Sequence, residues 1–442
     1  MTRKSNEKLV VEQDKYGILL PKYLNLVKEL VKKYPVVIEK DYLELVNFKK
    51  NKEEPVHRWF DYKQGYAAEL IHKILNDEKP SKKFDILDPF TGVGTTNLVA
   101  QQQGYDSIGL DINPVASFAA IVKTRTYSEK DIENLKNLKK SFKLTVSKNI
   151  PQSKLLDEAF DGQSFNQLMN IKGFFENIED IKLSEFYKLG YLSIIEDCSN
   201  RVKDGNGIKI VENKKKIANV YDYYLQKIDL MIEDLVKKVG QAKVTIIDNT
   251  LADDLTYTKI MNHNKGIGIV IFSPPYANCF DYCEVYKLEL WMGDFVKTYS
   301  DFEKYRKMAM RSHVNAKFNH EISVHNEKVQ LVADIISCHN VWNKNIPDMI
   351  RGYFDDMFKI MQRVKNLMVS GAKCYIVVAN SGYRGILVPT DLLIADICNT
   401  LGYDVEKIIY ARKIRASSQQ MKELHDEYEN LMRESIIVVK NK

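Results

Sequence analysis

The chain has 442 residues, a length that allows two to four domains of about 100 to 200 residues each, with a core of ample size. Hydrophobic residues make up 45% and charged residues 28% of the chain, which excludes a wholly disordered or fibrous protein. Lys and Arg number 65 against 59 Asp and Glu, and this formal charge of +6 permits a polyanionic partner without requiring one.

The 6 cysteines show no paired Cys-x-x-Cys spacing, so the sequence predicts neither a zinc site nor a disulfide framework, and no metal is expected. The charged N-terminus is not followed by an apolar segment, and the longest apolar runs, such as 267–272, fall far short of the roughly 20 residues that span a membrane. We therefore expect a cytoplasmic protein in a reducing compartment, with no membrane partner.

Residues 22–50 carry apolar side chains at helical spacing, for example Leu24, Val27 and Leu30, and the charged run 49–54 follows. This pattern predicts a helical N-terminal preface that ends in a linker. Seven downstream runs suit buried or half-buried strands, and they cover residues 84–87, 107–110, 243–247, 267–272, 373–379, 403–410 and 434–440. Helical patterns lie between several of these runs, for example at 98–103, 357–368 and 391–401.

This alternation predicts an α/β fold with a seven-stranded, mostly parallel, doubly wound sheet. The connections 123–242 and 277–372 are too long for simple crossovers and must contain structure of their own. The connection 123–242 has helical sequence patterns at 132–143 and 221–238, so we expect a largely helical inserted subdomain there. The predicted domains are a preface at 1–54, a first core part at 55–122, the insertion at 123–242, and a second core part at 243–442 with an insertion near 296–345.

The first predicted strand runs directly into Asp88-Pro-Phe-Thr-Gly-Val-Gly-Thr-Thr96, a glycine-bearing turn that leads into a helix. Gly92 and Gly94 allow the backbone to approach a ligand closely, and the helix presents unpaired N–H groups. By itself this pattern is equally consistent with a tight structural turn. Because the loop begins with a carboxylate and lacks the Lys-Ser/Thr of a P-loop, it suits a cationic or amino-bearing ligand rather than a triphosphate.

Two more acids end predicted strands. Asp111 closes the second strand, where a carboxylate accepts both hydroxyls of a ribose. Asp248 closes the third, where it can accept from an adenine amino group, although a solvated acid is an equally consistent reading. Because the carboxyl ends of parallel strands meet at one edge of a sheet, the three acids together fit S-adenosylmethionine better than NAD, with Asp88 opposite the ammonium group.

The fourth predicted strand leads into Ser273-Pro-Pro-Tyr276. The two prolines remove two backbone donors and stiffen the turn, which leaves the carbonyls of Ser273 and Pro274 to accept from an exocyclic amine. The Tyr276 ring offers a face on which a base can stack, a contact worth about 1 to 3 kcal/mol per base. Since a Pro-Pro pair is also a common loop stiffener, this prediction depends on the position of the motif one strand beyond the predicted cofactor loop.

Together, these motifs resemble the S-adenosylmethionine-dependent amino-methyltransferases of DNA, in particular the site-specific methylases of bacterial restriction-modification systems. The Ser-Pro-Pro-Tyr form is typical of the cytosine-N4 branch. Segments that resemble further sequence motifs of this family occur at 57–66, 280–290, 379–385, 389–391, 417–420 and 434–439. The resemblance implies a Rossmann-like class I methyltransferase fold. The cofactor loop precedes Ser-Pro-Pro-Tyr in the chain, an order more usual among adenine-N6 enzymes, so adenine-N6 methylation is an alternative.

The resemblance further implies direct methyl transfer to the N4 amine of a cytosine flipped out of double-stranded DNA, with no covalent enzyme intermediate. The catalytic residues it implies are Ser273, Pro274, Pro275 and Tyr276. Cofactor contacts are expected from Asp88, Pro89, Phe90, Gly92, Gly94, Thr95, Thr96, Asp111, Ile112, Asp248, Phe60 and Tyr62. Side chains that suit phosphates and base edges are Arg412, Arg415, Ser417, Ser418, Gln419 and Gln420, and the two insertions are further candidates for target recognition.

The sequence leaves rival functions open. A cytosine-C5 methylase needs a nucleophilic cysteine, usually after a proline; no proline here precedes a cysteine, and Cys279 and Cys283 are interpreted as packing residues. A DNA-binding protein that senses the cofactor without turnover is a second rival, and a methylase of protein glutamine or RNA is a third. We expect a prokaryotic, nucleoid-associated enzyme with a cognate restriction endonuclease as partner, and the sequence predicts no oligomeric state.

Overall fold

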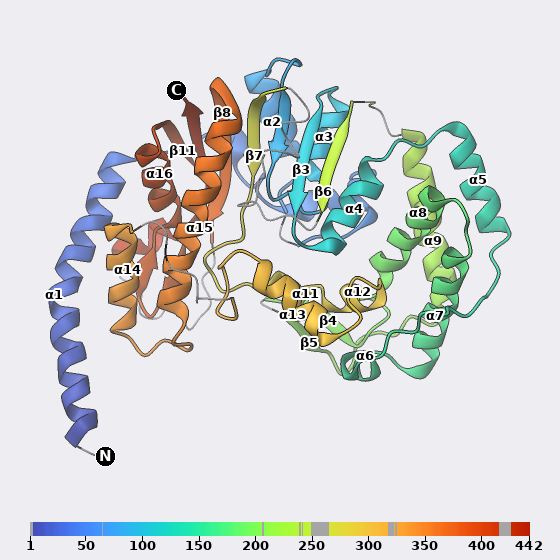
Figure 1. The fold of residues 1–442 in the computed structure, drawn as a ribbon, viewed down its shortest axis with the longest axis horizontal. Helices are drawn as coiled ribbons and strands as arrows, with labels where there is room; N and C mark the ends of the chain where they lie inside the picture. Colours follow the sequence, from blue (N-terminus) through green and yellow to red (C-terminus); the bar gives the residue numbers. More distant parts are fainter. Residues whose placement is uncertain are drawn as a thin grey trace. The chain divides into compact units, whose positions relative to one another are not determined.

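The computed structural model of the protein describes residues 3–63, 65–205, 207–237, 240, 242–248, 265–316, 322, 325–414 and 426–442. By its internal contacts the chain divides into two compact units. Unit 1 consists of Met1–Val46, Ala252–Phe280 and Ala309–Lys442, and unit 2 consists of Asn47–Leu251 and Asp281–Met308. Figure 1 shows the course of the chain through these segments.

Unit 2 contains three parallel strands in the order β2 (Asp85–Asp88), β3 (Ser107–Asp111) and β6 (Val244–Asp248). Parallel neighbours require a crossover, and α3 (Thr95–Gln102) supplies the one from β2 to β3. The helix α4 (Pro114–Thr124) follows β3 and packs against β6, while α2 (Ala68–Glu78) packs against α3. Ile86, Leu87 and Ile108 are buried, as expected for strands covered on both faces.

The segment between β3 and β6 is mainly helical, as predicted (Figure 1). It contains α5 (Glu129–Lys140), α6 (Lys154–Ala159), α7 (Gly162–Glu176), α8 (Ile181–Ile194), the hairpin β4 (Arg201–Asp204) and β5 (Gly207–Ile210), and α9 (Val220–Lys237). The side chains of Ser128, Ser153, Asp161 and Asp180 accept backbone N–H groups at four helix starts. The helix α8 packs against α7, α9 and α4, so the insertion is joined to the strand-bearing part of unit 2.

A second segment completes unit 2 and brings α11 (Tyr282–Val285), α12 (Lys287–Met292) and α13 (Tyr299–Met308). The helix α12 packs against α4, and α11 packs against the hairpin strand β5. Three short 3-10 helices also occur near the start of the chain: η1 (Lys40–Tyr42), η2 (Phe48–Lys52) and η3 (His57–Trp59), of which η2 and η3 belong to unit 2.

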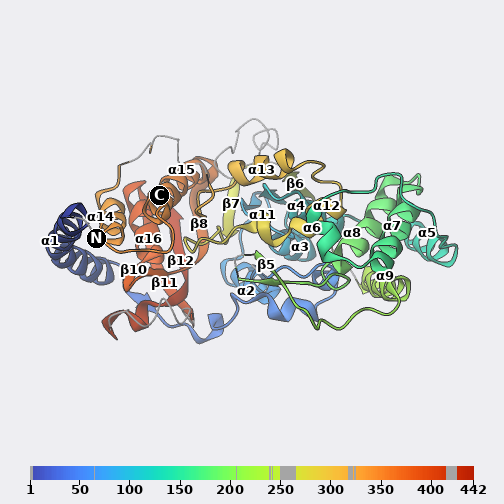
Figure 2. The same ribbon diagram turned by 90° about the horizontal axis from the view of Figure 1, so that it is seen from below.

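Unit 1 has the strand order β1 (Val36–Val37), β11 (Tyr403–Lys413), β12 (Arg433–Asn441), β8 (Met368–Ala379) and β7 (Ile267–Phe272). The pairs β7–β8 and β1–β11 are parallel, whereas β12 is antiparallel to both β8 and β11. The helix α16 (Thr390–Thr400) packs on β8, β11 and β12. Figure 2 shows α1 (Arg3–Lys33) beside α14 (Glu327–Ser337), which packs in turn on α15 (Ile346–Leu367). A short hairpin, β9 (Ser381–Tyr383) with β10 (Ile386–Val388), and η4 (Asp426–Leu431) complete the described elements.

All seven predicted runs are strands, and the predicted α/β, Rossmann-like fold class is confirmed. Among these strands the parallel pairs β2–β3, β3–β6, β7–β8 and β1–β11 outnumber the antiparallel pairs β8–β12 and β11–β12. The helix predicted across 22–50 is wrong beyond Lys33, because Pro35 cannot continue it and residues 36–37 form an edge strand instead. In the described part of the chain, no helix is both long and apolar enough to cross a bilayer.

Asp234 on α9 ties the aromatic segment 56–59 to the inserted helices of unit 2. Its carboxylate is 0% exposed and accepts hydrogen bonds from the backbone N of Val56 at 2.9 Å and from Nε1 of Trp59 at 3.1 Å. Arg58 donates to the same carboxylate from Nε at 3.0 Å and from Nη2 at 2.6 Å. Four hydrogen bonds to one buried carboxylate therefore hold this short segment.

We predict that Asp234→Ala lowers the free energy of unfolding by about 3 to 5 kcal/mol, because it leaves Arg58 without its buried partner. Asp229→Ala on the same helix is the matched control, since Asp229 is half-exposed in its ion pair with Lys139 and its loss costs less than about 1 kcal/mol. Urea unfolding followed by circular dichroism checks both values. Equal shifts of the two midpoints would contradict the bracing role of Asp234.

Candidate active site

The loop 88–96 of unit 2 joins the end of β2 to the start of α3, and its glycines are required by the geometry. Gly92 has φ 52° and Gly94 has φ 80°, both in the left-handed region. A Cβ atom on Gly92 would lie 2.9 Å from the Tyr62 ring, and one on Gly94 would lie 2.9 Å from the Cβ of Ala120. The loop backbone thus approaches its neighbours more closely than any side chain at these positions would allow.

Two carboxylates shape this loop. Asp88 accepts from the Tyr66 hydroxyl at 2.9 Å and from the backbone N of Phe90 at 3.0 Å. Asp111, at the end of β3, accepts from the backbone N of Gly92 at 2.8 Å and from that of Asn113 at 2.8 Å. Each acid therefore holds backbone N–H groups of the turn that follows its own strand, and Asp111 also holds the neighbouring loop.

Both carboxylates lie in a desolvated environment. Burial raises the pKa of Asp88 from 3.8 to about 7, against the opposing effect of its hydrogen bonds to Thr96, Tyr66 and Phe90. Asp111 keeps partial exposure, and desolvation raises its pKa to about 6. Among the described residues, the hydrogen-bond partners of the two acids are hydroxyl and backbone N–H groups rather than Lys, Arg or His side chains. The two groups can therefore receive a cation and hydroxyl donors from a ligand.

The other residues predicted to contact the cofactor lie at several depths in unit 2. Phe90 and Ile112 are half-exposed beside the acids, whereas Pro89, Thr95 and Thr96 are buried. The Thr96 hydroxyl bonds to that of Tyr66 and so supports the side chain that donates to Asp88. Asp248 pairs in register with Asp111 through its backbone, and its side chain lies outside the described residues.

A buried polar cluster lies beneath the loop, and the sequence motifs do not predict it. The Thr91 hydroxyl bonds to Asn97, whose amide donates to the Ser107 hydroxyl at 3.1 Å. A Cβ atom on Gly109 would lie 2.6 Å from Oδ1 of Asn97, which explains a glycine inside strand β3. Gly109 is the one feature of the sequence that indicates this cluster, since a glycine within a strand marks a close approach of other atoms.

Aromatic rings form a wall on one side of the loop. Tyr62, whose ring contacts Gly92, stacks on Tyr286 with ring centroids 5.2 Å apart and planes inclined by 16°. Phe60 packs against the same Tyr286 ring at 6.2 Å. Of the two predicted aromatic contacts, Tyr62 therefore lies against the loop, and Phe60 lies one ring further back.

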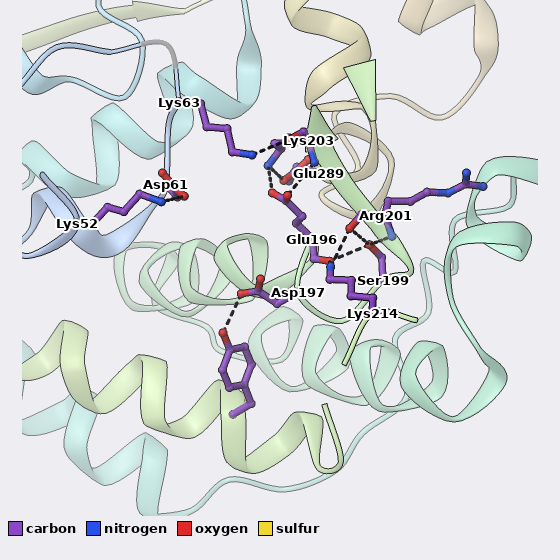
Figure 3. A network of polar contacts seen from close by, with 11 residues as sticks. Lys52, Asp61, Lys63, Glu196, Asp197, Ser199, Arg201, Lys203, Lys214 and Glu289 are labelled. Carbon is purple, nitrogen blue, oxygen red and sulfur yellow. Dashed lines mark hydrogen bonds and ion pairs between the residues drawn. The ribbon is translucent and has the colours of Figure 1, made fainter. Parts of the chain in front are cut away.

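Lys203 supports this wall from the hairpin strand β4 of the insertion (Figure 3). Its ammonium lies 4.5 Å from the Tyr286 ring centroid, bonds to buried Glu289 and pairs with Glu196 at 3.0 Å. Burial by itself lowers the pKa of Lys203, but the two carboxylates outweigh burial and raise it. The lysine therefore stays charged over the ring. Because these residues are far apart in the chain, no sequence pattern could have identified them.

In unit 1, Ser273-Pro-Pro-Tyr276 follows β7 directly. Ser273, Pro275 and Tyr276 are half-exposed and Pro274 is buried. The Ser273 hydroxyl donates to the Val377 carbonyl at 3.1 Å. The Tyr276 hydroxyl, at 3.4 Å, is a second and longer acceptor for the same proton. Since either acceptor uses the one proton, the lone pairs of the Ser273 hydroxyl remain to accept hydrogen bonds.

The exit from this motif is held by the hairpin β9–β10 and by a neighbouring loop. The Ala277 carbonyl accepts from the Ser381 hydroxyl at 2.8 Å and from the Tyr383 hydroxyl at 2.7 Å. Cys279 has φ 68°, and its backbone N donates to the Ser312 carbonyl at 3.1 Å. The turn after Tyr276 is therefore fixed on both sides.

The residues predicted to bind DNA are only partly described. Arg412, on β11, donates from Nε to Glu434 at 2.6 Å, and the Tyr276 hydroxyl donates to the same carboxylate. Arg415, Ser417, Ser418, Gln419 and Gln420 lie outside the described residues. The structure thus gathers Asp88, Gly92, Asp111 and Tyr62 in unit 2 and the Ser-Pro-Pro-Tyr motif with Arg412 in unit 1.

Comparison with known proteins supports one interpretation of these residues. Residues 13–121 match the family model described as DNA methylase, of the N6/N4 type. Type II methyltransferase M.BsoBI from Geobacillus stearothermophilus is 25% identical, over 89% of this chain and 88% of its own length. Type II methyltransferase M.AvaI from Nostoc sp. is 24% identical, over 86% of each chain.

Among solved structures, the rRNA methyltransferase aviRa from Streptomyces viridochromogenes is similar at 10% identity with a TM-score of 0.31, over 89% of this chain and 92% of that chain. That likeness is too low to bear on the site, whereas the sequence relatives match the chain almost from end to end. The chain is therefore similar to DNA methylases of the N6/N4 type and to type II methyltransferases, and this similarity implies S-adenosylmethionine as the methyl donor.

Proposed function

We propose that the protein methylates the exocyclic N4 amine of a cytosine in double-stranded DNA, as the modification enzyme of a restriction-modification system. The observation that carries this proposal is the state of the Ser273 hydroxyl, whose proton is engaged with the Val377 carbonyl at 3.1 Å. A neutral group that can only accept suits an amine, which brings N–H donors to it.

The residues of unit 2 fit the methyl donor. S-adenosylmethionine supplies, when bound, a methyl carbon made electrophilic by a positively charged sulfur. Asp88 is a buried carboxylate with capacity for the ammonium of the methionine tail, and Asp111 has capacity for two ribose hydroxyls. Gly92 has no Cβ atom, which would lie 2.9 Å from the Tyr62 ring, so the loop keeps its left-handed turn beside Asp111. Asp248 is proposed for the adenine amino group.

The residues of Ser-Pro-Pro-Tyr act on the amine. The lone pair of an exocyclic amine is delocalised into the base, so the amine is a weak nucleophile. Acceptors at Ser273 and at the Pro274 carbonyl draw its N–H groups out of the ring plane and localise the lone pair. The stiff proline turn keeps these acceptors in place. The motif therefore acts by orienting the amine and not by forming a covalent bond to the base. Tyr276 stacks on the base once it has left the duplex.

Cytosine-C5 methylation is disfavoured by the state of the nearby cysteines. A C5 enzyme attacks the base with a thiolate, and burial raises the pKa of the Cys279 thiol to about 11 and that of Cys283 further still. Both side chains are buried, and Cys279 contacts Met349 and Tyr383. Adenine-N6 methylation and a cofactor-sensing protein without turnover are the remaining candidates that the experiment separates.

The test is to incubate the protein with tritiated S-adenosylmethionine and unmethylated genomic DNA, and to identify the labelled nucleoside by chromatography. We expect N4-methylcytosine, a rate lowered about 10- to 100-fold by Ser273→Ala because an acceptor is lost, and near-normal transfer by the matched control Cys279→Ser. Labelled N6-methyladenine would contradict the choice of base. The cofactor-sensing alternative predicts bound cofactor and no label in DNA, RNA or protein.

The raised pKa values of the two acids predict how cofactor binding depends on pH. Because the folded-state pKa of Asp88 is about 7 against 3.8, the folded protein holds this proton more tightly than the unfolded chain. The free energy of unfolding of the ligand-free protein therefore falls as pH rises from about 4 to 7, while the affinity for an ammonium-bearing ligand rises as the acids ionise. Binding should release protons in this range.

We expect the Kd for S-adenosylhomocysteine to fall by about one to two orders of magnitude between pH 5.5 and 7.5, as measured by calorimetry in two buffers of different ionisation enthalpy. Asp88→Asn is the matched variant, since it keeps the side chain's size and removes its titration. Its Kd should be weaker and should change with pH only through Asp111. An affinity of the unsubstituted protein that does not vary with pH would rule out the proposed role of Asp88.

A further inference from the structure

Glu434 is a buried acid at the start of the closing strand of unit 1. The residue is 3% exposed, and β12 continues from it into the buried run Ile436, Ile437, Val438 and Val439. Its backbone pairs with Arg412 of β11 on one side and Ala379 of β8 on the other. A carboxylate between two strands at this depth loses its hydration, and burial accordingly raises its pKa.

The two oxygens of this carboxylate have different partners. One accepts from the Tyr276 hydroxyl, and the other accepts from Nε of Arg412 at 2.6 Å. Arg412 and Tyr276 both favour the charged form and so oppose the effect of burial. The acid therefore joins the tyrosine of Ser-Pro-Pro-Tyr to an arginine of the neighbouring strand.

These contacts fix the Tyr276 ring at both ends. At the backbone, Pro274 and Pro275 restrict the turn, and the Ala277 carbonyl is held by Ser381 and Tyr383. At the other end of the ring, the Tyr276 hydroxyl donates to Glu434. The Ser273 hydroxyl lies 3.4 Å from the same Tyr276 hydroxyl. A ring held at its base and its tip loses little further freedom when a base stacks on it.

We propose that Glu434 is a positioning residue that keeps the Tyr276 ring in place as the stacking surface for the flipped base. In this arrangement Arg412 holds the Glu434 carboxylate in place and does not contact a phosphate of the DNA. The proposal rests on the proposed function, because it gives Tyr276 its role. It assigns no proton transfer to Glu434 and needs none, since the hydroxyl is anchored and not deprotonated.

The test compares Glu434→Gln, Tyr276→Phe and the double variant in the full-length protein. The DNA is a duplex carrying the recognised sequence, either unmodified for kinetics or with 2-aminopurine at the target position for fluorescence lifetimes. We expect each single change to lower kcat by about tenfold and to reduce the short-lifetime, stacked fraction of 2-aminopurine. The KM for S-adenosylmethionine should not change, and the double variant should be no worse than either single one.

Asp396→Asn is the matched control in the same unit. Asp396 is a buried carboxylate that accepts from the Tyr34 hydroxyl at 3.0 Å and pairs with Lys33 at 3.0 Å and Lys328 at 2.6 Å. It thus has the same combination of tyrosine, acid and cation without contact to Tyr276. We expect this variant to lower the Tm and to leave both kcat and the 2-aminopurine lifetimes unchanged.

A Glu434→Gln protein with kcat within twofold of the unsubstituted protein and an unchanged stacked fraction would overturn the proposal. Additive losses in the double variant, or the same losses in Asp396→Asn, would overturn it too, because they would point to general destabilisation. If Glu434→Gln does not fold, Tyr276→Phe alone carries the test, since it removes one oxygen atom. Absence of methyl transfer by the unsubstituted protein would instead overturn the proposed function, and it is measured separately.

Discussion

Desolvation of carboxylates at strand ends is the constraint from which the chemistry of this protein follows. Asp88 and Asp111 end adjacent parallel strands, and each holds backbone N–H groups that shape the loop beside it. The same burial that makes them useful as loop anchors raises their pKa values to about 7 and about 6. A protein that keeps two such acids without cationic partners in its described part is suited to a ligand that supplies a cation and hydroxyl groups.

The polar networks around the two motifs have a common design. In unit 2, Lys203 sits between Glu196 and Glu289 and lies over the Tyr286 ring that supports Tyr62. In unit 1, Arg412 and Glu434 anchor the hydroxyl of Tyr276. In both cases a buried ion pair holds an aromatic ring rather than adding much stability, since desolvation offsets most of the Coulomb attraction. Such networks hold the side chains in one arrangement, and a site that binds its ligand in a fixed geometry needs that rigidity.

The elements that could be predicted are those whose signals are contiguous in the chain. The strand-loop-helix at 85–102 and the strand before Ser273 each carry their pattern in one continuous stretch of the chain, and all seven predicted runs are strands. The helix predicted across 22–50 ends at Lys33 because Pro35 cannot continue it, although the apolar spacing runs on beyond that residue. The sequence does not predict the supporting roles of Lys203 and Glu434, because Glu289 lies 86 residues from Lys203 and Tyr276 lies 158 residues from Glu434 along the chain. In the sequence, Glu434 is an acid before a run of Val and Ile residues, a pattern that indicates only the start of a strand.

We propose that the acids closing the first two strands of unit 2 hold the methyl donor. A crystal structure of the protein with S-adenosylhomocysteine bound tests this proposal most directly. We expect the ribose hydroxyls within hydrogen-bond distance of the Asp111 carboxylate and the ammonium group within hydrogen-bond distance of Asp88. A nucleoside bound elsewhere, or one whose ribose and ammonium groups contact neither acid, would contradict the claim.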